Sequence, residues 1–233
     1  MSSESGPNLI TNGLVLCLDA ANPLSYKSGA TVWNDLTYNT SGGTLTNGPT
    51  YNLNNGGSIV FDGVDDYVNI GNIGNYSTIS YTLESFIYPE FDSSANGRPF
   101  FTKGLDCGNG EFSVEYGRTA NKFSFLSSFN IIALTSNSTY PKNNWYHVVI
   151  TRTNNGNSTY TNRLYVNGIL DNTTTVSYPT ETTNGNLSIG GQNICSAGAD
   201  FLGKITISRI YNRALSAQEV LQNYNSTKSR FGL

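Results

Sequence analysis

Three aspartates stand close together in the sequence, where they can either stabilise a turn or bind a cation. Asp62, Asp65 and Asp66 surround Gly63, a residue type that commonly ends a strand in a turn. Carboxylate oxygens are also the ligands that calcium prefers. The sequence therefore leaves two interpretations of these acids open, turn stabilisation and a calcium site.

Catalytic groups are the second kind of chemistry to test. Glycoside hydrolysis needs two carboxyl groups roughly 5 to 10 Å apart. Glu111 and Glu115 are four residues apart, which on a strand places both side chains on one face about 13 Å apart. The single histidine, His147, lies in an apolar stretch beside Trp145, which favours a core position over membership of a Ser–His–acid triad. We therefore expect no enzymatic activity.

Aromatic side chains in loops offer a third kind of chemistry, the binding of sugars. Tyrosine rings stack on the apolar faces of sugars, and asparagine amides form hydrogen bonds with sugar hydroxyls. The candidates are loop tyrosines that we expect to be exposed: Tyr26, Tyr38, Tyr51 and Tyr140. The alternative is that each tyrosine packs on its own domain.

The three cysteines predict a free thiol and one candidate disulfide. Cys17 lies in the apolar run Leu14–Leu18, which indicates a buried thiol. Cys107 and Cys195 lie in Gly-rich stretches, where they are candidates for pairing.

The composition restricts the elements that must position these residues. The chain has 31 Asn, 26 Ser, 25 Thr and 24 Gly, which together make 106 of its 233 residues. Charged residues reach only 12% and the formal net charge is −3. Few residues favour helix, and no basic cluster could neutralise phosphates, so we expect a single β domain that binds no nucleic acid. No apolar run approaches the roughly 20 residues of a membrane helix, and Met1–Asn12 lacks a secretory signal pattern.

Strand patterns recur about every ten residues, separated by turn residues, as in antiparallel sandwiches. We expect an N-terminal arm at residues 1–12, a sandwich at 13–225 and a polar C-terminal tail at 226–233. The expected strands are Gly13–Asp19, Ser58–Asp62, Asp65–Ile70, Ser80–Tyr88, Arg98–Thr102, Glu111–Tyr116, Lys122–Phe129, Ile131–Thr135, Trp145–Thr153, Tyr160–Val166, Ile169–Leu170, Asn186–Gly190 and Gly203–Tyr211.

Two local patterns are specific. Asn167 and Gly168 lie between two apolar segments, as in a type I′ hairpin turn, and a second break at Asn154–Asn157 suggests a three-stranded meander. Ser216 and Glu219 have the spacing of a capping box, which predicts one short C-terminal helix whose Val220, Leu221 and Tyr224 face the sandwich.

Five motifs resemble the laminin-G-like, concanavalin-A-like lectin/glucanase superfamily. They are Phe61–Val68, Asn144–Val148, Leu164–Gly168, Phe201–Gly203 and Ile210–Glu219. The resemblance implies an all-β fold, a jelly-roll β-sandwich of two curved antiparallel sheets.

Other segments are similar to the version of this domain found in structural proteins of tailed bacteriophages and other viruses. These are Gly13–Ala21, Trp33–Leu36 and Asn223–Leu233. Where many relatives have an acidic pair after Gly-x-Ile, this chain has Thr206 and Ile207, which weakens a calcium site carried over from the family. The Glu-x-Asp-x-x-Glu strand of the glucanase branch is also missing, so the family's hydrolase activity does not transfer.

The resemblance implies a non-enzymatic virion structural protein, a capsid decoration or fibre-associated subunit that displays a lectin-like domain. Its expected location is the virion surface, or else the extracellular space. The expected partners are capsid or fibre proteins, with cell-surface glycans and further copies of the chain as additional candidates. The alternative function is a carbohydrate-binding lectin module outside any virion, and a glycoside hydrolase is a third, weaker candidate.

Overall fold

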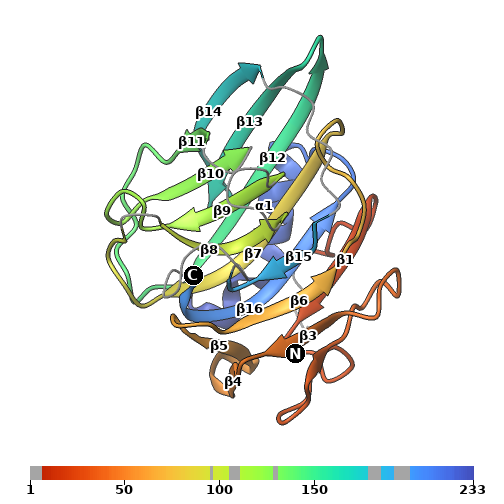
Figure 1. Ribbon diagram of the computed structural model, residues 1–233, viewed down its shortest axis with the longest axis vertical. Coiled ribbons are helices and arrows are strands. Elements are labelled where there is room, and N and C mark those ends of the chain that lie inside the picture. Colours follow the sequence, from red (N-terminus) through yellow and green to blue (C-terminus); the bar gives the residue numbers. More distant parts are fainter. Residues whose placement is uncertain (1–6, 95–96, 105–110, 128–130, 178–184, 192–199) are drawn as a thin grey trace, which may run out of the picture.

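Two antiparallel sheets packed face to face form the protein, as the resemblance implied. The structure is a computed structural model that describes residues 7–94, 97–104, 111–127, 131–177, 185–191 and 200–233. Within these residues each sheet has eight strands, and one α-helix, α1 (Ala217–Thr227), follows the last strand. In Figure 1 one sheet lies in front of the other, with α1 behind both. The expected all-β jelly-roll sandwich with a short C-terminal helix is confirmed.

The strands of sheet A run in the order β14-β13-β12-β7-β16-β5-β4, and β1 pairs with β16 beyond the end of β5. Their bounds are β1 (Leu14–Asp19), β4 (Thr50–Asn52), β5 (Ser58–Asp62), β7 (Tyr81–Pro89), β12 (Tyr146–Gly156), β13 (Thr159–Val166), β14 (Ile169–Ser177) and β16 (Leu202–Tyr211).

The strands of sheet B run in the order β11-β10-β9-β8-β15-β6-β3-β2. Their bounds are β2 (Val32–Trp33), β3 (Gly43–Thr46), β6 (Tyr67–Gly71), β8 (Arg98–Lys103), β9 (Phe112–Tyr116), β10 (Phe123–Ser127), β11 (Ile132–Thr135) and β15 (Leu187–Ile189). Two short 3-10 helices, η1 (Asn54–Gly56) and η2 (Lys228–Phe231), complete the described elements.

The main core lies between the sheets and is rich in aromatic residues. Alternate residues of each strand point inward, so Phe61 and Ile205 of sheet A face Phe100 and Phe123 of sheet B. Full burial of such a side chain contributes about 1.5–3 kcal/mol to stability. The inward faces therefore hold the sandwich together, which leaves the polar residues for turns and outer faces.

The expected strands from β5 onward are found within a few residues of their predicted ends, except β14, which was expected at Ile169–Leu170 and continues to Ser177, and β2, β3 and β4 were not predicted. These three strands have only two to four residues each. β3 and β4 are rich in Thr, Gly and Asn, so their strand conformation comes from pairing with β6 and β5 rather than from local preference. β2 has only Val32 and Trp33, which pair with β3 and are too few to form a recognisable pattern.

Both predicted hairpin turns exist. Asn167 and Gly168 have φ values of 51° and 78°, which confirms the type I′ turn between β13 and β14. Asn157 and Ser158, with φ values of 51° and 56°, close the other hairpin, so β12 continues to Gly156, beyond the predicted end. β12 lies between β7 and β13, as expected for a central strand.

The C-terminal segment packs on the outer face of sheet A. The predicted capping box is present, since Ser216 accepts a hydrogen bond from the Glu219 backbone and Glu219 accepts one from the Ser216 backbone. Val220 is buried, whereas Leu221 is exposed rather than facing the sandwich. Helix α1 extends past the predicted boundary at 225, and within the predicted tail Phe231 stacks on Phe86 with ring centroids 5.0 Å apart.

The described residues of the predicted N-terminal arm also pack on the domain. The Ile10 backbone N–H donates to Asn223 of α1 at 3.0 Å, and Gln222 donates to the Asn8 carbonyl at 2.7 Å. Both terminal segments thus meet at α1. Within the described residues, no helix is long and apolar enough to cross a membrane.

A fully buried carboxylate anchors this outer layer. One oxygen of Glu84 in β7 accepts hydrogen bonds from Arg209 of β16 at 2.6 Å and from His147 of β12 at 3.1 Å. Its other oxygen accepts from the Asn223 side chain of α1 at 2.8 Å. Burial alone would raise the pKa of Glu84, but the Arg209 charge and the bonds from His147 and Asn223 outweigh it and lower the pKa to about 2.

We expect Glu84→Gln to lower the free energy of unfolding by about 3–5 kcal/mol, because Arg209 would stay buried without its counter-charge. Because the pKa of Glu84 is lowered, its ionised carboxylate stabilises the wild type at pH values above 4.5, the ordinary pKa of a glutamate. This contribution is lost as the pH falls towards 2, and the variant should show no such loss. Urea unfolding across this pH range measures both effects. Glu90→Gln, at a partly exposed ion pair, is the control and should cost less than about 1 kcal/mol. Equal costs for the two variants would contradict the anchoring role.

Candidate functional site

Two of the four predicted sugar-binding tyrosines come together at one end of the sandwich. The rings of Tyr26 and Tyr51 have centroids 5.2 Å apart and an interplanar angle of 43°. They border an open groove with a volume of about 390 Å³. We call it the tyrosine groove, and its lining residues are Tyr26, Ser28, Gly29, Ala30, Thr31, Leu45, Gly48, Pro49, Thr50 and Tyr51. None of these residues carries a charge.

Backbone hydrogen bonds hold both tyrosines in place. Tyr26 lies in the turn after β1, where its backbone N–H donates to the Asn22 carbonyl, and its hydroxyl donates to the Ala30 carbonyl at 2.9 Å. The hydroxyl of Tyr51, in β4, donates to the Ala20 carbonyl at 3.0 Å. Because Tyr26 is buried and the Tyr51 hydroxyl is already used, the groove presents mainly the ring surface of Tyr51 to a ligand.

The prediction that Tyr26 is exposed is wrong, since only 4% of it is accessible, and burial raises the pKa of its phenol. Tyr51 is half-buried. The sequence did not identify Leu45 or Pro49 as groove residues, because they reach it only through the short strands β3 and β4. Exposed hydroxyls at the rim, from Ser28 and Thr31, supply the polar groups of the groove.

The other two predicted tyrosines do not line the groove. Tyr38 is 82% exposed, as expected for a loop residue. Tyr140 is half-buried against Phe123, and its hydroxyl donates to Asp171 at 2.7 Å. Burial and the Asp171 carboxylate both raise the pKa of Tyr140. Tyr140 therefore packs on its own domain, in agreement with the alternative interpretation, and the expectation that it is exposed is wrong.

The three aspartates form a compact cluster after β5. One ligand oxygen from each of Asp62, Asp65 and Asp66 lies within 4.8 Å of the others. Asp66 accepts a hydrogen bond from the Asp62 backbone at 3.0 Å, and Asp62 accepts one from the Val64 backbone at 2.8 Å. Two of the carboxylates thus stabilise the turn, in agreement with the first of the two interpretations.

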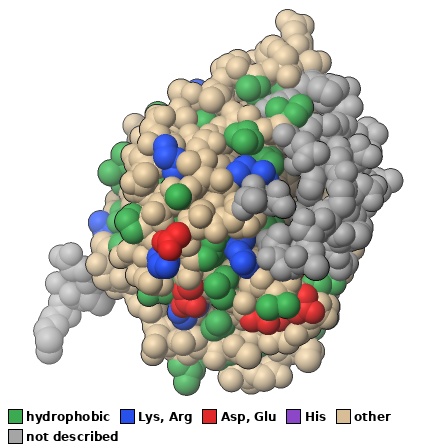
Figure 2. Space-filling view, turned by 60° about the vertical axis from the view of Figure 1, so that its left-hand side comes forward, with side chains coloured by type: hydrophobic (Ala, Val, Ile, Leu, Met, Phe, Trp, Pro, Cys, Tyr) green, Lys and Arg blue, Asp and Glu red, His purple; other side chains and the backbone are tan. Residues whose placement is uncertain are grey.

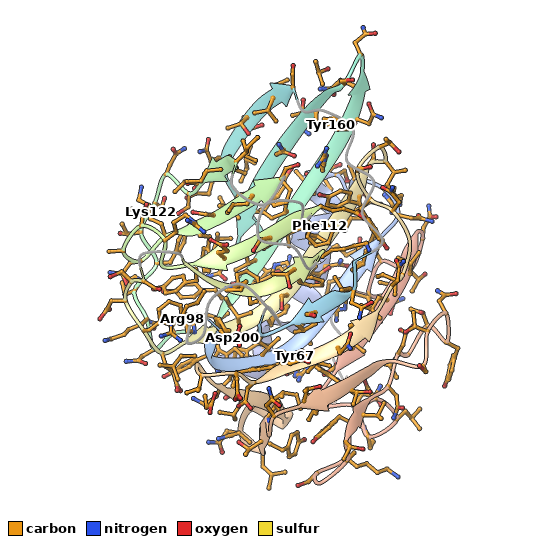
Figure 3. All side chains as sticks on the ribbon, in the orientation of Figure 1. Tyr67, Arg98, Phe112, Lys122, Tyr160 and Asp200 are labelled. Carbon is orange, nitrogen blue, oxygen red and sulfur yellow. The ribbon has the colours of Figure 1, made fainter. Side chains whose placement is uncertain are left out.

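A cation of the chain lies beside this turn. Arg98 donates to the carbonyls of Gly63 at 2.8 Å and of Asp200 at 2.7 Å, and Figure 3 shows Arg98 and Asp200 side by side near Tyr67. The three acids have the ligand chemistry of a calcium site, but calcium takes six to eight oxygens and two of these carboxylates already accept backbone N–H groups. The contacts therefore favour turn stabilisation.

The acids and the histidine considered for catalysis are engaged in structural contacts. Glu111 accepts from the Tyr76 backbone at 2.6 Å and forms an ion pair with Lys103 at 3.6 Å. Glu115 pairs with Arg118 at 2.7 Å. His147 is fully buried beneath α1, as the sequence predicted.

Among the cysteines, Cys17 is 5% exposed and free, which confirms the predicted buried thiol, and burial raises its pKa. The candidate pair Cys107 and Cys195 lies outside the described residues.

The fold and these motifs define the class of protein. Residues 62–221 match the Concanavalin A-like lectin/glucanases superfamily, and the chain belongs to this family. No curated protein sequence matches the chain.

Solved structures with the same fold include carbohydrate-binding proteins. Domain 4 of AbnA, a GH43 extracellular arabinanase from Geobacillus stearothermophilus, in complex with arabinotriose, is similar with a TM-score of 0.69 and 17% identity, covering 91% of this chain and 98% of that one. The sialidase of Trypanosoma rangeli, in complex with sialic acid, gives a TM-score of 0.70 and 19% identity over 97% of this chain and 35% of that one. The receptor binding domain of botulinum neurotoxin type G gives 0.62 and 16%, over 92% and 51%. The chain thus spans about a third of the sialidase and half of the toxin domain.

The two interpretations of the aspartate cluster, turn stabilisation and a calcium site, can be tested by substitution. Burial raises the pKa of Asp66, and the charges of Asp62 and Asp65 add to this rise against the opposing effect of the Asp62 backbone bond. We expect Asp65→Asn to raise the free energy of unfolding at pH 7 by up to about 1 kcal/mol, since it removes like-charge repulsion and leaves the turn bonds intact. Asp92→Asn, at an exposed ion pair with Lys142, is the control and should give no gain. A melting temperature that rises with millimolar calcium in the wild type, but not in Asp65→Asn, would support a calcium site instead.

Proposed function

We propose that this protein is a non-catalytic carbohydrate-binding module whose binding site is the tyrosine groove. The observation that supports this most directly is the half-buried ring of Tyr51, which packs on the buried Tyr26 in one groove beside the apolar side chains of Leu45 and Pro49. A sugar has one apolar face and many hydroxyls. Its binding site therefore requires ring surface that excludes water and a few hydroxyls at the rim.

The size and charge of the groove indicate the class of sugar. Its volume of about 390 Å³ lies at the lower end of the roughly 300–1,000 Å³ range of small-molecule sites, which suits a short oligosaccharide. Because none of the described lining residues is charged, a neutral sugar is favoured over a sialic or uronic acid. The arabinotriose complex of the similar arabinanase domain supports this class of ligand.

The contacts of the acidic residues support a binding role over a catalytic one. Glu111 and Glu115 each have a basic partner, and Glu84 is fully buried in its own network. A general acid or nucleophile needs a carboxyl group that can approach the glycosidic bond.

Display on a virion surface, as a capsid decoration or fibre-associated subunit, is the second role that we propose for the domain. It rests on the resemblance of the terminal segments to viral structural proteins. Figure 2 shows a mostly uncharged polar face on which charged side chains form small groups, a surface suited to hydrogen-bonded contacts with neighbouring subunits or glycans. Detection of the protein in purified particles by mass spectrometry would support this role, and its absence from them would contradict it.

Blocking the groove tests the binding role. We expect Ser28→Arg to abolish retention on an array of neutral oligosaccharides, because the exposed Ser28 lines the groove and a longer side chain would occupy it. Circular dichroism and thermal melting should show an unchanged fold.

Thr44→Arg is the matched control, since Thr44 is exposed on β3 outside the groove lining and should leave binding unchanged. No retention of the wild-type protein by any neutral glycan, with or without calcium, would contradict the proposal. Equal retention of wild type and Ser28→Arg would contradict the choice of site.

A further inference from the structure

The outer face of sheet A carries ordered rows of side chains that the C-terminal segment covers only in part. Since β7, β12 and β16 are neighbours, their outward residues lie side by side across the sheet. Asn223 of helix α1 covers the row that contains Glu84. Phe231 of η2 covers the next row, where it stacks on Phe86. Within the described residues, α1 and η2 leave the following row, beyond Phe231, partly open, and Asn54 and Asn55 of η1 border it.

This uncovered row forms an aromatic corner. Tyr88 of β7 pairs in register with Lys204 of β16, and Trp145 immediately precedes β12. The rings of Tyr88 and Trp145 have centroids 5.5 Å apart, and Phe231 supports Trp145 with centroids 4.7 Å apart. Lys204 lies over the Tyr88 ring, its nitrogen 4.3 Å from the centroid.

A pocket of about 160 Å³ opens at this corner, and we call it the tryptophan pocket. It is lined by Asn52, Asn54, Asn55, Ser58, Tyr88, Trp145 and Lys204. One wall is aromatic and the opposite wall carries amides and a hydroxyl. The volume is below the roughly 300–1,000 Å³ of sites for drug-sized ligands, so the pocket suits a single ring rather than a chain.

Ser58 supplies an independent indication of a ligand. It is 1% exposed, and its hydroxyl has no hydrogen-bond partner within the described part of the chain. A buried hydroxyl without a partner lowers stability, so such groups are rare in proteins and a ligand hydroxyl would satisfy this one. By comparison, the hydroxyl of the buried Ser85 has a partner, since it donates to the Ile207 carbonyl.

The charges in the pocket indicate a neutral ligand. Lys204 forms an ion pair with Glu90, which balances its charge. An ammonium group has three donors, so Lys204 keeps donors for the oxygens of a ligand. Among the described residues that line the pocket, only Lys204 is charged.

We propose that the tryptophan pocket is a second carbohydrate site, which takes one neutral sugar ring stacked on Trp145. The ring's hydroxyls bond Ser58 and Lys204, and the amides of Asn52 and Asn54 border the opening. A sugar ring presents an apolar face to an aromatic ring and hydroxyls at its edge, which matches the two unlike walls.

This site is distinct from the tyrosine groove. Tyr51 lines the groove and the next residue of β4, Asn52, lines the tryptophan pocket. Successive side chains of a strand point to opposite faces, so β4 separates the two sites. The proposal thus goes beyond the groove, and each site can fail without the other.

Fluorescence gives a reporter for the tryptophan pocket. The chain has two tryptophans, and Trp33 is fully buried whereas Trp145 is half-buried. Quenching by acrylamide therefore reports mainly on Trp145. We expect at least one of arabinose, xylose, glucose, galactose, mannose or N-acetylglucosamine, at millimolar concentrations, to protect Trp145, and glucuronic acid to give weaker protection.

Ser58→Ala should weaken that protection about tenfold, as loss of one hydrogen bond predicts, while the melting temperature stays unchanged or rises because an unpaired hydroxyl is removed. Ser28→Ala, the same substitution in the tyrosine groove, is the matched control and should leave protection unchanged. Ser28→Arg should also leave it unchanged, even where it abolishes retention on the array.

Three results would overturn this second site. They are no protection by any neutral sugar, equal protection of wild type and Ser58→Ala, and protection by glucuronic acid alone. Loss of protection together with a lowered melting temperature in Ser58→Ala would show a structural role for the hydroxyl and would also overturn it. None of these results bears on binding in the tyrosine groove, which the array measures.

Discussion

The buried charge of Glu84 is the constraint on which the outer layer of the protein depends. A carboxylate removed from water must be paired, and its partners come from two neighbouring strands and from α1. Meeting this requirement fixes α1 over one end of sheet A, and the chain that follows α1 then reaches Phe86 and Trp145 through Phe231. The tryptophan pocket is the part of the sheet that this covering segment leaves open.

The edge of sheet A near β4 is where binding surfaces can form, because the sandwich ends there in short strands, turns and the 3-10 helix η1. β4 has three residues, and its neighbouring side chains Tyr51 and Asn52 line two different hollows. The central strands of sheet A, β7, β12 and β16, are longer and most of their residues are buried. The central strands thus form the rigid part of the sandwich, and the short strand β4 at the edge forms part of the walls of both hollows.

The sequence predicted what local rules determine. Apolar and alternating runs predicted the long strands other than β14, the Asn167-Gly168 pair predicted its turn, and Ser216 with Glu219 predicted the helix start. The short strands β3 and β4 could not be predicted because pairing with β6 and β5 makes them extended, and β2 could not because its two residues form no pattern. For the same reason, four loop tyrosines looked alike in sequence, yet two meet at the groove while Tyr140 is fixed by Asp171, 31 residues further along.

The abundant asparagines serve conformation more than recognition. Of the eight described residues other than glycine with positive φ, six are Asn. Several others, such as Asn22, Asn72 and Asn75, accept a hydrogen bond from the backbone two residues ahead and so close their own turn. A turn closed by its own side chain does not depend on its neighbours. During evolution such turns can therefore be exchanged one at a time, which lets the surface of the sandwich diversify while its sheets stay unchanged.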